Sequence, residues 1–79
     1  MTRSVFSNQY DRFRSLLVVA RKNRGLTQVE LARLLERPQS FVSKVERGER
    51  RLDVVEFLEV ARALEIDVSG FLADLERED

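Results

Sequence analysis

Residues 24–48, RGLTQVELARLLERPQSFVSKVERG, contain two short amphipathic segments separated by a turn. The first begins at Thr27, which forms the capping-box pattern T-x-x-E with Glu30, and apolar residues follow it at helical spacing. It ends before Pro38, because the residue that precedes a proline is disfavoured in the helical region. The second segment has Pro38 at its start and Gly48 at its end. The stretch therefore predicts two short helices joined by a tight turn.

Three further segments show the same helical periodicity. One runs from about residue 8 to residue 23, with Asn8 as its expected N-cap, and its apolar face comprises Tyr10, Phe13, Leu16, Leu17 and Ala20. Another starts at Asp53, which forms a second capping pattern with Glu56, and its apolar stripe comprises Val54, Phe57, Leu58, Ala61 and Leu64. The last starts at Asp67 and carries Val68, Phe71, Leu72 and Leu75. Strand alternation and internal repeats are absent from the sequence, which predicts a compact all-α domain of five helices.

Composition excludes several function classes. The chain has 79 residues, enough for one small domain, and contains no cysteine, histidine or tryptophan. Disulfide frameworks, thiolate nucleophiles, imidazole bases and metal sites of nitrogen and sulfur ligands are therefore excluded, and we expect no cofactor and no metal. The apolar runs are too short to span a membrane, and the N-terminus lacks the apolar core of a signal peptide. We expect a cytoplasmic protein.

The zero net charge of the chain conceals an uneven distribution of charges. Residues 1–51 contain twelve basic and five acidic residues, a net charge of +7, whereas residues 52–79 contain two basic and nine acidic residues, a net charge of −7. Such asymmetry indicates that the first part meets an anionic partner, and the plain alternative is a chance clustering of surface charges.

The segment over residues 39–47 has two contrasting faces when it is drawn as a helix. Its packed face comprises Phe41, Val42 and Val45. Its other face is wholly polar and comprises Gln39, Ser40, Ser43, Lys44 and Arg47. Side chains of these types can donate hydrogen bonds to base edges or phosphates, and no carboxylate lies among them. The pair of helices fits a DNA-binding helix-turn-helix, and an ordinary αα corner with a solvated face remains the alternative.

The stretch from Arg24 to Leu72 closely resembles the Cro and lambda-repressor type of helix-turn-helix domain, the XRE family. The most specific elements are R-G-L-T-Q-x-E-L-A followed by Q-S-x-V-S-K-x-E-R-G. The resemblance implies a compact five-helix fold of the lambda-repressor-like type and a non-enzymatic transcriptional regulator that binds a palindromic operator as a homodimer. It also implies that the protein is bacterial or phage-like and associates with the nucleoid when it is bound to DNA.

The resemblance assigns expected roles to individual residues. The expected base-reading residues are Gln39, Ser40, Ser43 and Lys44. The expected phosphate contacts are Gln28, Arg24, Arg47, Arg50 and Arg51. Gln28 is also expected to brace Gln39, Arg21 and Glu46 are expected to form a buried ion pair, and Ala32 is expected to let the second and third helices cross closely.

Two positions depart from the family pattern. Glu36 stands at the turn position that usually carries glycine, and a left-handed backbone there would cost about 1 kcal/mol. Phe41 is a large apolar residue where relatives often have a small or polar one. We favour inward packing of Phe41 over contact with a thymine methyl group.

We expect residues 1–7 to form an N-terminal arm and residues 8–79 to form the domain, with the helix-turn-helix at about 27–47 and a dimer helix at about 68–76. The dimer-interface candidates are Phe71, Leu72 and Leu75, which could equally close the core of the monomer. A protein-interaction module on the same fold, such as an antitoxin-like or adaptor domain, is the alternative function. A protein partner such as a toxin or another regulator is compatible with both, and phage-like repressors, restriction-modification controllers and antitoxins all fit the sequence.

Overall fold

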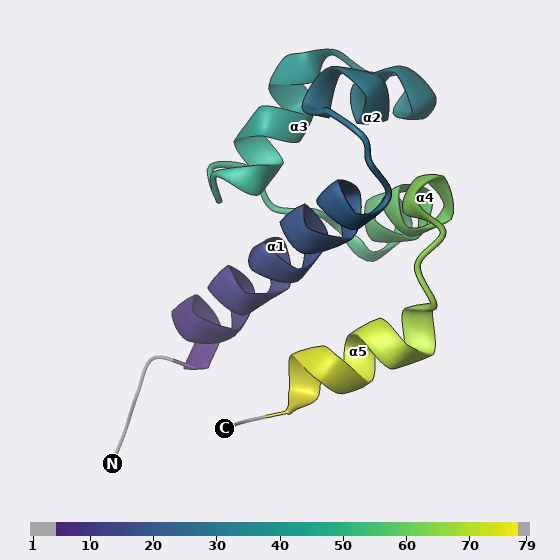
Figure 1. The fold of residues 1–79 in the computed structure, drawn as a ribbon. Coiled ribbons are helices and arrows are strands. Elements are labelled where there is room, and N and C mark those ends of the chain that lie inside the picture. Colours follow the sequence, from purple (N-terminus) through teal and green to yellow (C-terminus); the bar gives the residue numbers. More distant parts are fainter. Residues whose placement is uncertain (1–4, 78–79) are drawn as a thin grey trace.

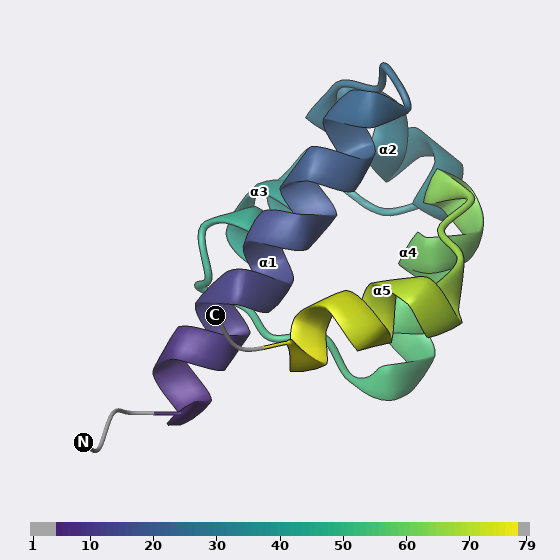
Figure 2. The same cartoon turned by 60° about the horizontal axis from the view of Figure 1, so that its bottom comes forward.

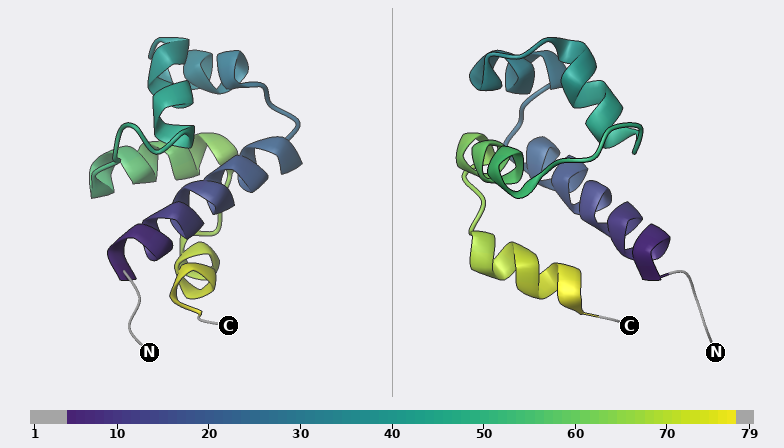
Figure 3. Two further views of the ribbon diagram at one scale, coloured as in Figure 1. Left: turned by 90° about the vertical axis from the view of Figure 1, so that its left-hand side faces the viewer. Right: turned by 180° about the vertical axis from the view of Figure 1, so that it is seen from behind.

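The structure is a computed structural model that describes the backbone of residues 5–77 and the side chains of residues 9–77. These residues form five α-helices, namely α1 (Val5–Asn23), α2 (Gln28–Leu35), α3 (Gln39–Glu46), α4 (Val54–Leu64) and α5 (Val68–Glu76). α2 and α3 lie together at one end of the molecule, and α5 lies at the other end beside α1 (Figure 1, Figure 3). α1 and α4 join the two ends, and the predicted all-α fold is confirmed.

Both predicted capping boxes are present. The Thr27 hydroxyl accepts a hydrogen bond from the backbone amide of Glu30 at 3.1 Å, and the Glu30 carboxylate accepts one from the amide of Thr27 at 2.9 Å. Asp53 and Glu56 form the same reciprocal pair at the start of α4, at 2.8 and 3.1 Å. Each box satisfies amide groups that lack a partner inside the helix, which fixes where α2 and α4 begin.

Two predicted helix starts differ from the structure. α1 begins at Val5, three residues before the predicted cap Asn8, so residues 5–7 belong to the first helix and residues 1–4 of the predicted arm lie outside the described residues. Asparagine is a weak stop signal because it costs only a few tenths of a kcal/mol inside a helix. Asp67 occupies the N-cap position of α5 but makes no capping hydrogen bond. Its ψ is 104°, against 169° and 174° at the two boxed caps, and its carboxylate lies beside Gly70 without accepting a capping hydrogen bond.

Three phenylalanine rings join α1, α4 and α5. Phe13 lies 5.5 Å from Phe57 and 5.8 Å from Phe71, and the rings of Phe57 and Phe71 lie 5.2 Å apart. Tilted and edge-on aromatic pairs at these separations contribute beyond the area that they bury. Phe71 is therefore a core residue of the monomer, which is one of the two roles that the sequence left open for it. Its place in a dimer interface stays a prediction.

The buried face of α4 differs in part from the predicted stripe. Phe57, Ala61 and Leu64 are buried as expected, and Val60 joins them. Val54 and Leu58, which were placed in the same stripe, are 73% and 40% exposed. Positions 57, 60, 61 and 64 form one face at spacings of three and four, and Val54 and Leu58 lie to one side of that face.

Arg12 fastens the last helix to the first. Its Nε and Nη2 atoms donate hydrogen bonds to the backbone carbonyl of Asp74 at 3.2 and 2.7 Å. The last carbonyls of a helix have no partner within it, and a guanidinium is a favourable donor to them. This contact and the phenylalanine cluster hold α5 against α1. Figure 2 shows the end of α5 next to α1.

Glu36 adopts the left-handed backbone conformation that is usual for a glycine at this turn position, with φ of 58° and ψ of 43°. The amides of Glu36 and Arg37 donate to the carbonyls of Arg33 and Ala32, which closes α2 with a Schellman motif. Glu65 ends α4 in the same way, with φ of 56°. A residue with a Cβ atom is strained in this region, so each turn keeps its geometry at a cost of about 1 kcal/mol.

Replacing Glu36 with glycine should relieve this strain. We expect the Glu36→Gly variant to unfold with a free energy about 1 kcal/mol higher than that of Glu36→Ala, since alanine retains the Cβ atom. Urea unfolding followed by circular dichroism measures both values. Equal stability of the two variants would show that the left-handed turn carries no strain.

Candidate nucleic-acid interface

The polar face of α3 is open to solvent. Gln39, Ser40, Lys44 and the C-cap Arg47 are exposed, and Ser43 is half-buried. Phe41, Val42 and Val45 on the opposite face are buried, as the sequence predicts. Within the described part of the chain, the side chains of Gln39, Ser40 and Lys44 make no hydrogen bond to protein groups. Their donors and acceptors are therefore available to an external partner.

A buried ion pair fixes α3 against α1. Arg21 Nε lies 2.7 Å from Glu46 Oε2 and Arg21 Nη2 lies 3.0 Å from Glu46 Oε1, with both side chains 10% exposed. A third donor on Arg21, Nη1, bonds to the carbonyl of Leu26 at 2.8 Å. The contact implied by the family resemblance is therefore present, and it is bidentate, which is the strongest arrangement for an arginine and a carboxylate.

Gln28 takes part in the same cluster. Its Nε2 atom donates to Glu46 Oε1 at 2.9 Å. The expected contact between Gln28 and Gln39 is not formed in this structure, because the Gln28 amide nitrogen is turned toward the ion pair. Gln28 therefore links the start of α2 to the last residue of α3.

Arg14 is a positioning residue that sequence reasoning missed. Its Nη1 atom donates to the backbone carbonyl of Glu46 at 2.8 Å, and its guanidinium lies beside Gly48, where φ is +79°. The signal was present in the sequence, because Arg14 and Arg21 are seven residues apart and so lie on one face of α1. Arg14 and Arg21 thus hold both the backbone and the side chain of Glu46.

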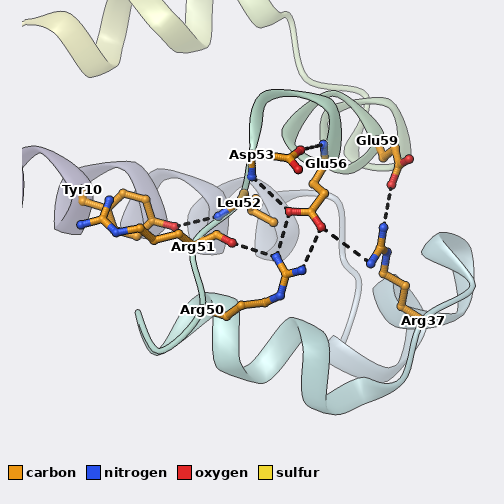
Figure 4. Close-up of polar contacts among 8 residues, drawn as sticks. All are labelled: Tyr10, Arg37, Arg50, Arg51, Leu52, Asp53, Glu56 and Glu59. Atoms are coloured by element: carbon orange, nitrogen blue, oxygen red, sulfur yellow. Dashed lines mark hydrogen bonds and ion pairs between the residues drawn. The ribbon is translucent and has the colours of Figure 1, made fainter.

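A second cluster lies on the opposite side of α3, around the carboxylate of Glu56 (Figure 4). Arg50 Nη1 and Nη2 donate to the two Glu56 oxygens at 2.8 and 2.9 Å. Arg37 Nη1 lies 3.9 Å from Glu56 and Arg37 Nη2 donates to Glu59 at 3.2 Å. Because Glu56 also caps α4, one carboxylate joins the loop after α3 to the first turn of α4.

Phe41 packs inward, as the sequence interpretation favoured. It is 9% exposed, and the Arg37 and Arg50 guanidinium carbons lie 4.5 and 4.8 Å from the centre of its ring. Guanidinium groups at this distance are attracted to the negative face of an aromatic ring. The large residue at this position therefore belongs to the contact between α3 and α4.

The predicted phosphate contacts have different surroundings. Arg47 lies 3.0 Å from Glu49, Arg24 lies 3.1 Å from Glu65, and Arg50 is held by Glu56. Arg47 lowers the pKa of Glu49 through a hydrogen bond and its charge. Arg51 is exposed and lies 4.2 Å above the ring of Tyr10, with no carboxylate partner in the described ion pairs. Arg47, Arg50 and Arg51 follow α3 directly, whereas Arg24 lies near the end of α4.

Other kinds of site find no support in the described chain. Residues 5–77 contain no group of three or more acidic side chains arranged to hold a metal ion. None of the described helices has the length and hydropathy needed to cross a lipid bilayer.

Comparison with known proteins identifies the fold. A family model described as "Helix-turn-helix", of the XRE or Cro/lambda type, matches residues 19–71. The chain belongs to this family of DNA-binding domains. It is also similar to a solved structure, an XRE-family like protein from Pseudomonas syringae pv. tomato str. DC3000, at 47% identity and a TM-score of 0.87. The match covers 91% of this chain and 88% of that one. No curated protein matches the sequence significantly.

Membership settles the class of the molecule. XRE-type helix-turn-helix domains bind DNA and are not enzymes, which confirms the sequence prediction on both points. In this family the second of the two helices, here α3, is the one that enters the major groove. The exposed polar face of α3 is therefore the candidate DNA-binding surface of this domain.

Substitution of only one partner of the ion pair between Arg21 and Glu46 should lower the free energy of unfolding strongly. We expect Arg21→Met to destabilise the domain by about 3–5 kcal/mol, because Glu46 would remain buried without its counter-charge. The double variant Arg21→Met with Glu46→Leu should regain most of this loss. Thermal or urea unfolding measures all three proteins, and equal losses in the single and double variants would contradict the assignment.

The Glu56 cluster predicts a stability difference that depends on pH. Arg50, by hydrogen bonding, and the amide of Asp53 lower the pKa of Glu56 from 4.5 to about 2. Because the folded state favours the ionised form, this contribution is complete above the unfolded pKa and is lost as the pH falls toward 2. We expect Glu56→Gln to unfold at lower urea than the wild type at pH 7, and the difference to vanish near pH 2.

Glu30→Gln is the matched control for this experiment. Glu30 has the same capping-box position in α2 but forms no ion pair with another residue of the described chain. A glutamine can still accept the capping hydrogen bond, so the control should change stability little at any pH. A Glu56→Gln effect no larger than that of Glu30→Gln would overturn the role of Arg50 in the cluster.

Proposed function

We propose that this protein is a sequence-specific transcriptional regulator that binds a roughly palindromic operator as a homodimer. The observation that carries the proposal is the exposed face of α3, whose side chains are all polar and lack a carboxylate. Among the described residues, the side chains of Gln39, Ser40 and Lys44 on this face form no hydrogen bond with the protein. A solvated helix face without such a role normally mixes acidic and basic residues. We place the protein in the cytoplasm, on the nucleoid when it is bound.

Base reading falls to the first turns of α3. Gln39 is the first residue of the helix, and recognition helices contact base edges through their N-terminal residues. A glutamine can pair with adenine through two hydrogen bonds, and Lys44 can reach the acceptors of guanine. Ser40 and Ser43 complete the base-reading set.

Phosphate binding falls to the basic residues around α3. Arg51 is the strongest candidate, because it is exposed and its guanidinium has no carboxylate partner among the described residues. Arg47 and Arg24 must leave an exposed glutamate to bind a phosphate, which surface ion pairs allow at a cost below about 1 kcal/mol. Arg50 and Gln28 are tied to Glu56 and Glu46, so we expect them to position the site more than to contact DNA.

Selection of bound sequences from a random DNA pool tests the proposed function. We expect an enriched palindrome whose half-sites are about 10 base pairs apart, which is the spacing of successive major grooves on one side of DNA. A selection that enriches no sequence would favour the protein-interaction module on the same fold.

Two substitutions should separate base reading from phosphate binding. We expect Gln39→Ala to reduce the preference for the selected site over random DNA by about 1–3 kcal/mol. Arg51→Ala should instead weaken binding to both kinds of DNA by similar factors. Fluorescence anisotropy at fixed salt measures the four affinities. A uniform loss in Gln39→Ala would contradict base reading by this residue.

A further inference from the structure

α4 presents an apolar ridge to solvent. Val54 is 73% exposed, Val55 is 65% exposed and Leu58 is 40% exposed. Their spacing of three and four residues places them on one side of the helix, away from the buried side at Phe57. The large apolar side chains exposed on α1 and α2 are Val19, Val29 and Leu34. They are isolated from one another in the sequence, and isolated exposed apolar residues are normal on a protein surface. The ridge of Val54, Val55 and Leu58 is a contiguous patch, and such patches mark interaction sites.

A hollow flanks each end of this ridge. Beside Val54 lies a hollow of about 370 Å³ between α1, α4 and α5, whose apolar walls include Phe13, Leu72 and Leu75. Leu72 is itself 43% exposed at its rim. Beside Leu58 lies a second hollow of about 500 Å³, lined in part by Ile66 and Val68. One face of the molecule therefore carries both a protruding apolar ridge and apolar depressions.

A second copy of the chain fits this combination. In a two-fold pair each surface meets itself, so a face must carry both the projections and the depressions that receive them. Two antiparallel α4 helices that cross at Leu58 would also bring the exposed Arg62 of one copy close to the level of Asp53, the N-cap of α4, in the other, since these residues lie four and five positions from Leu58. Opposite charges would then flank the apolar centre of the interface, as is usual for protein interfaces.

The position of the ridge leaves the polar face of α3 free. No α3 residue lines either hollow, and of the proposed phosphate contacts only Arg51 borders one of them. Val55 immediately precedes Glu56, whose carboxylate holds the loop after α3 through Arg50. A partner on the ridge would therefore contact the helix turn that helps to orient α3 without covering Gln39 or Lys44.

We propose that the ridge of Val54, Val55 and Leu58, together with Leu72, is the surface through which a second copy of this chain binds. This inference rests on the proposed function, because a palindromic operator is bound by two copies of the chain. It keeps Leu72 from the residues predicted on α5 and adds the exposed side of α4.

The oligomeric state of the full chain tests this proposal. Sedimentation equilibrium should give a dimer for the wild type and a monomer for Val55→Glu, in which a charge replaces the centre of the ridge. An acidic residue in the first turn of a helix is favourable, so the variant should keep its fold, as circular dichroism would show. Leu58→Lys should have the same effect. Val19→Glu, at a side chain 52% exposed on α1, is the matched control and should remain a dimer.

The outcomes distinguish this inference from the proposed function. A monomeric wild type, or a dimer that survives both Val55→Glu and Leu58→Lys, overturns the ridge as the interface even if selection enriches a DNA sequence. Loss of the dimer in these two variants alone supports it, even if no DNA sequence is enriched. With an enriched palindrome in hand, Val55→Glu should bind a single half-site as the wild type does and lose its advantage on the full site.

Discussion

The buried carboxylate of Glu46 makes the contacts on which the orientation of α3 depends. α3 has eight residues, and a helix of this length is not stable by itself in water. Its orientation comes from what holds it, and Glu46 receives two hydrogen bonds from Arg21 and one from Gln28. Arg14 takes the backbone carbonyl of the same residue. Elements from three helices therefore meet at one residue, which sets the direction in which the polar face of α3 points.

A second glutamate holds α3 from the other side. Glu56 binds Arg50 in the loop after α3, and the guanidinium groups of Arg37 and Arg50 enclose Phe41. α3 is thus fixed between α1 and α4 by two clusters that use the same chemistry, a carboxylate surrounded by guanidinium donors. Such clusters are better suited to fixing a geometry than to adding stability, because the desolvation of the charges offsets much of their attraction. A reading surface needs that fixed geometry.

The sequence predicted the parts of the structure that follow from local rules. Capping pairs such as Thr27 with Glu30 and a helix-ending glycine such as Gly48 act over a few residues, so their positions agree with the structure. The two faces of α3 followed from helical periodicity in the same way. The Arg21 and Glu46 contact was found through the family resemblance, since no local pattern joins residues 25 positions apart.

The misplaced residues depend on contacts between distant elements. Nothing in residues 68–76 shows that Phe71 turns toward Phe13 and Phe57 while Leu72 stays exposed. In the same way, Arg50 looks like any other basic residue until α4 brings Glu56 to it. Because carboxylates pair with several arginines of residues 1–51, less of the net positive charge of this segment is available to an anionic partner. A phosphate bound to Arg47 or Arg24 in the proposed complex would displace a glutamate, and the freed carboxylate would attract cations from solution. The proposed complex would therefore release fewer counterions than the net charge of +7 on residues 1–51 suggests.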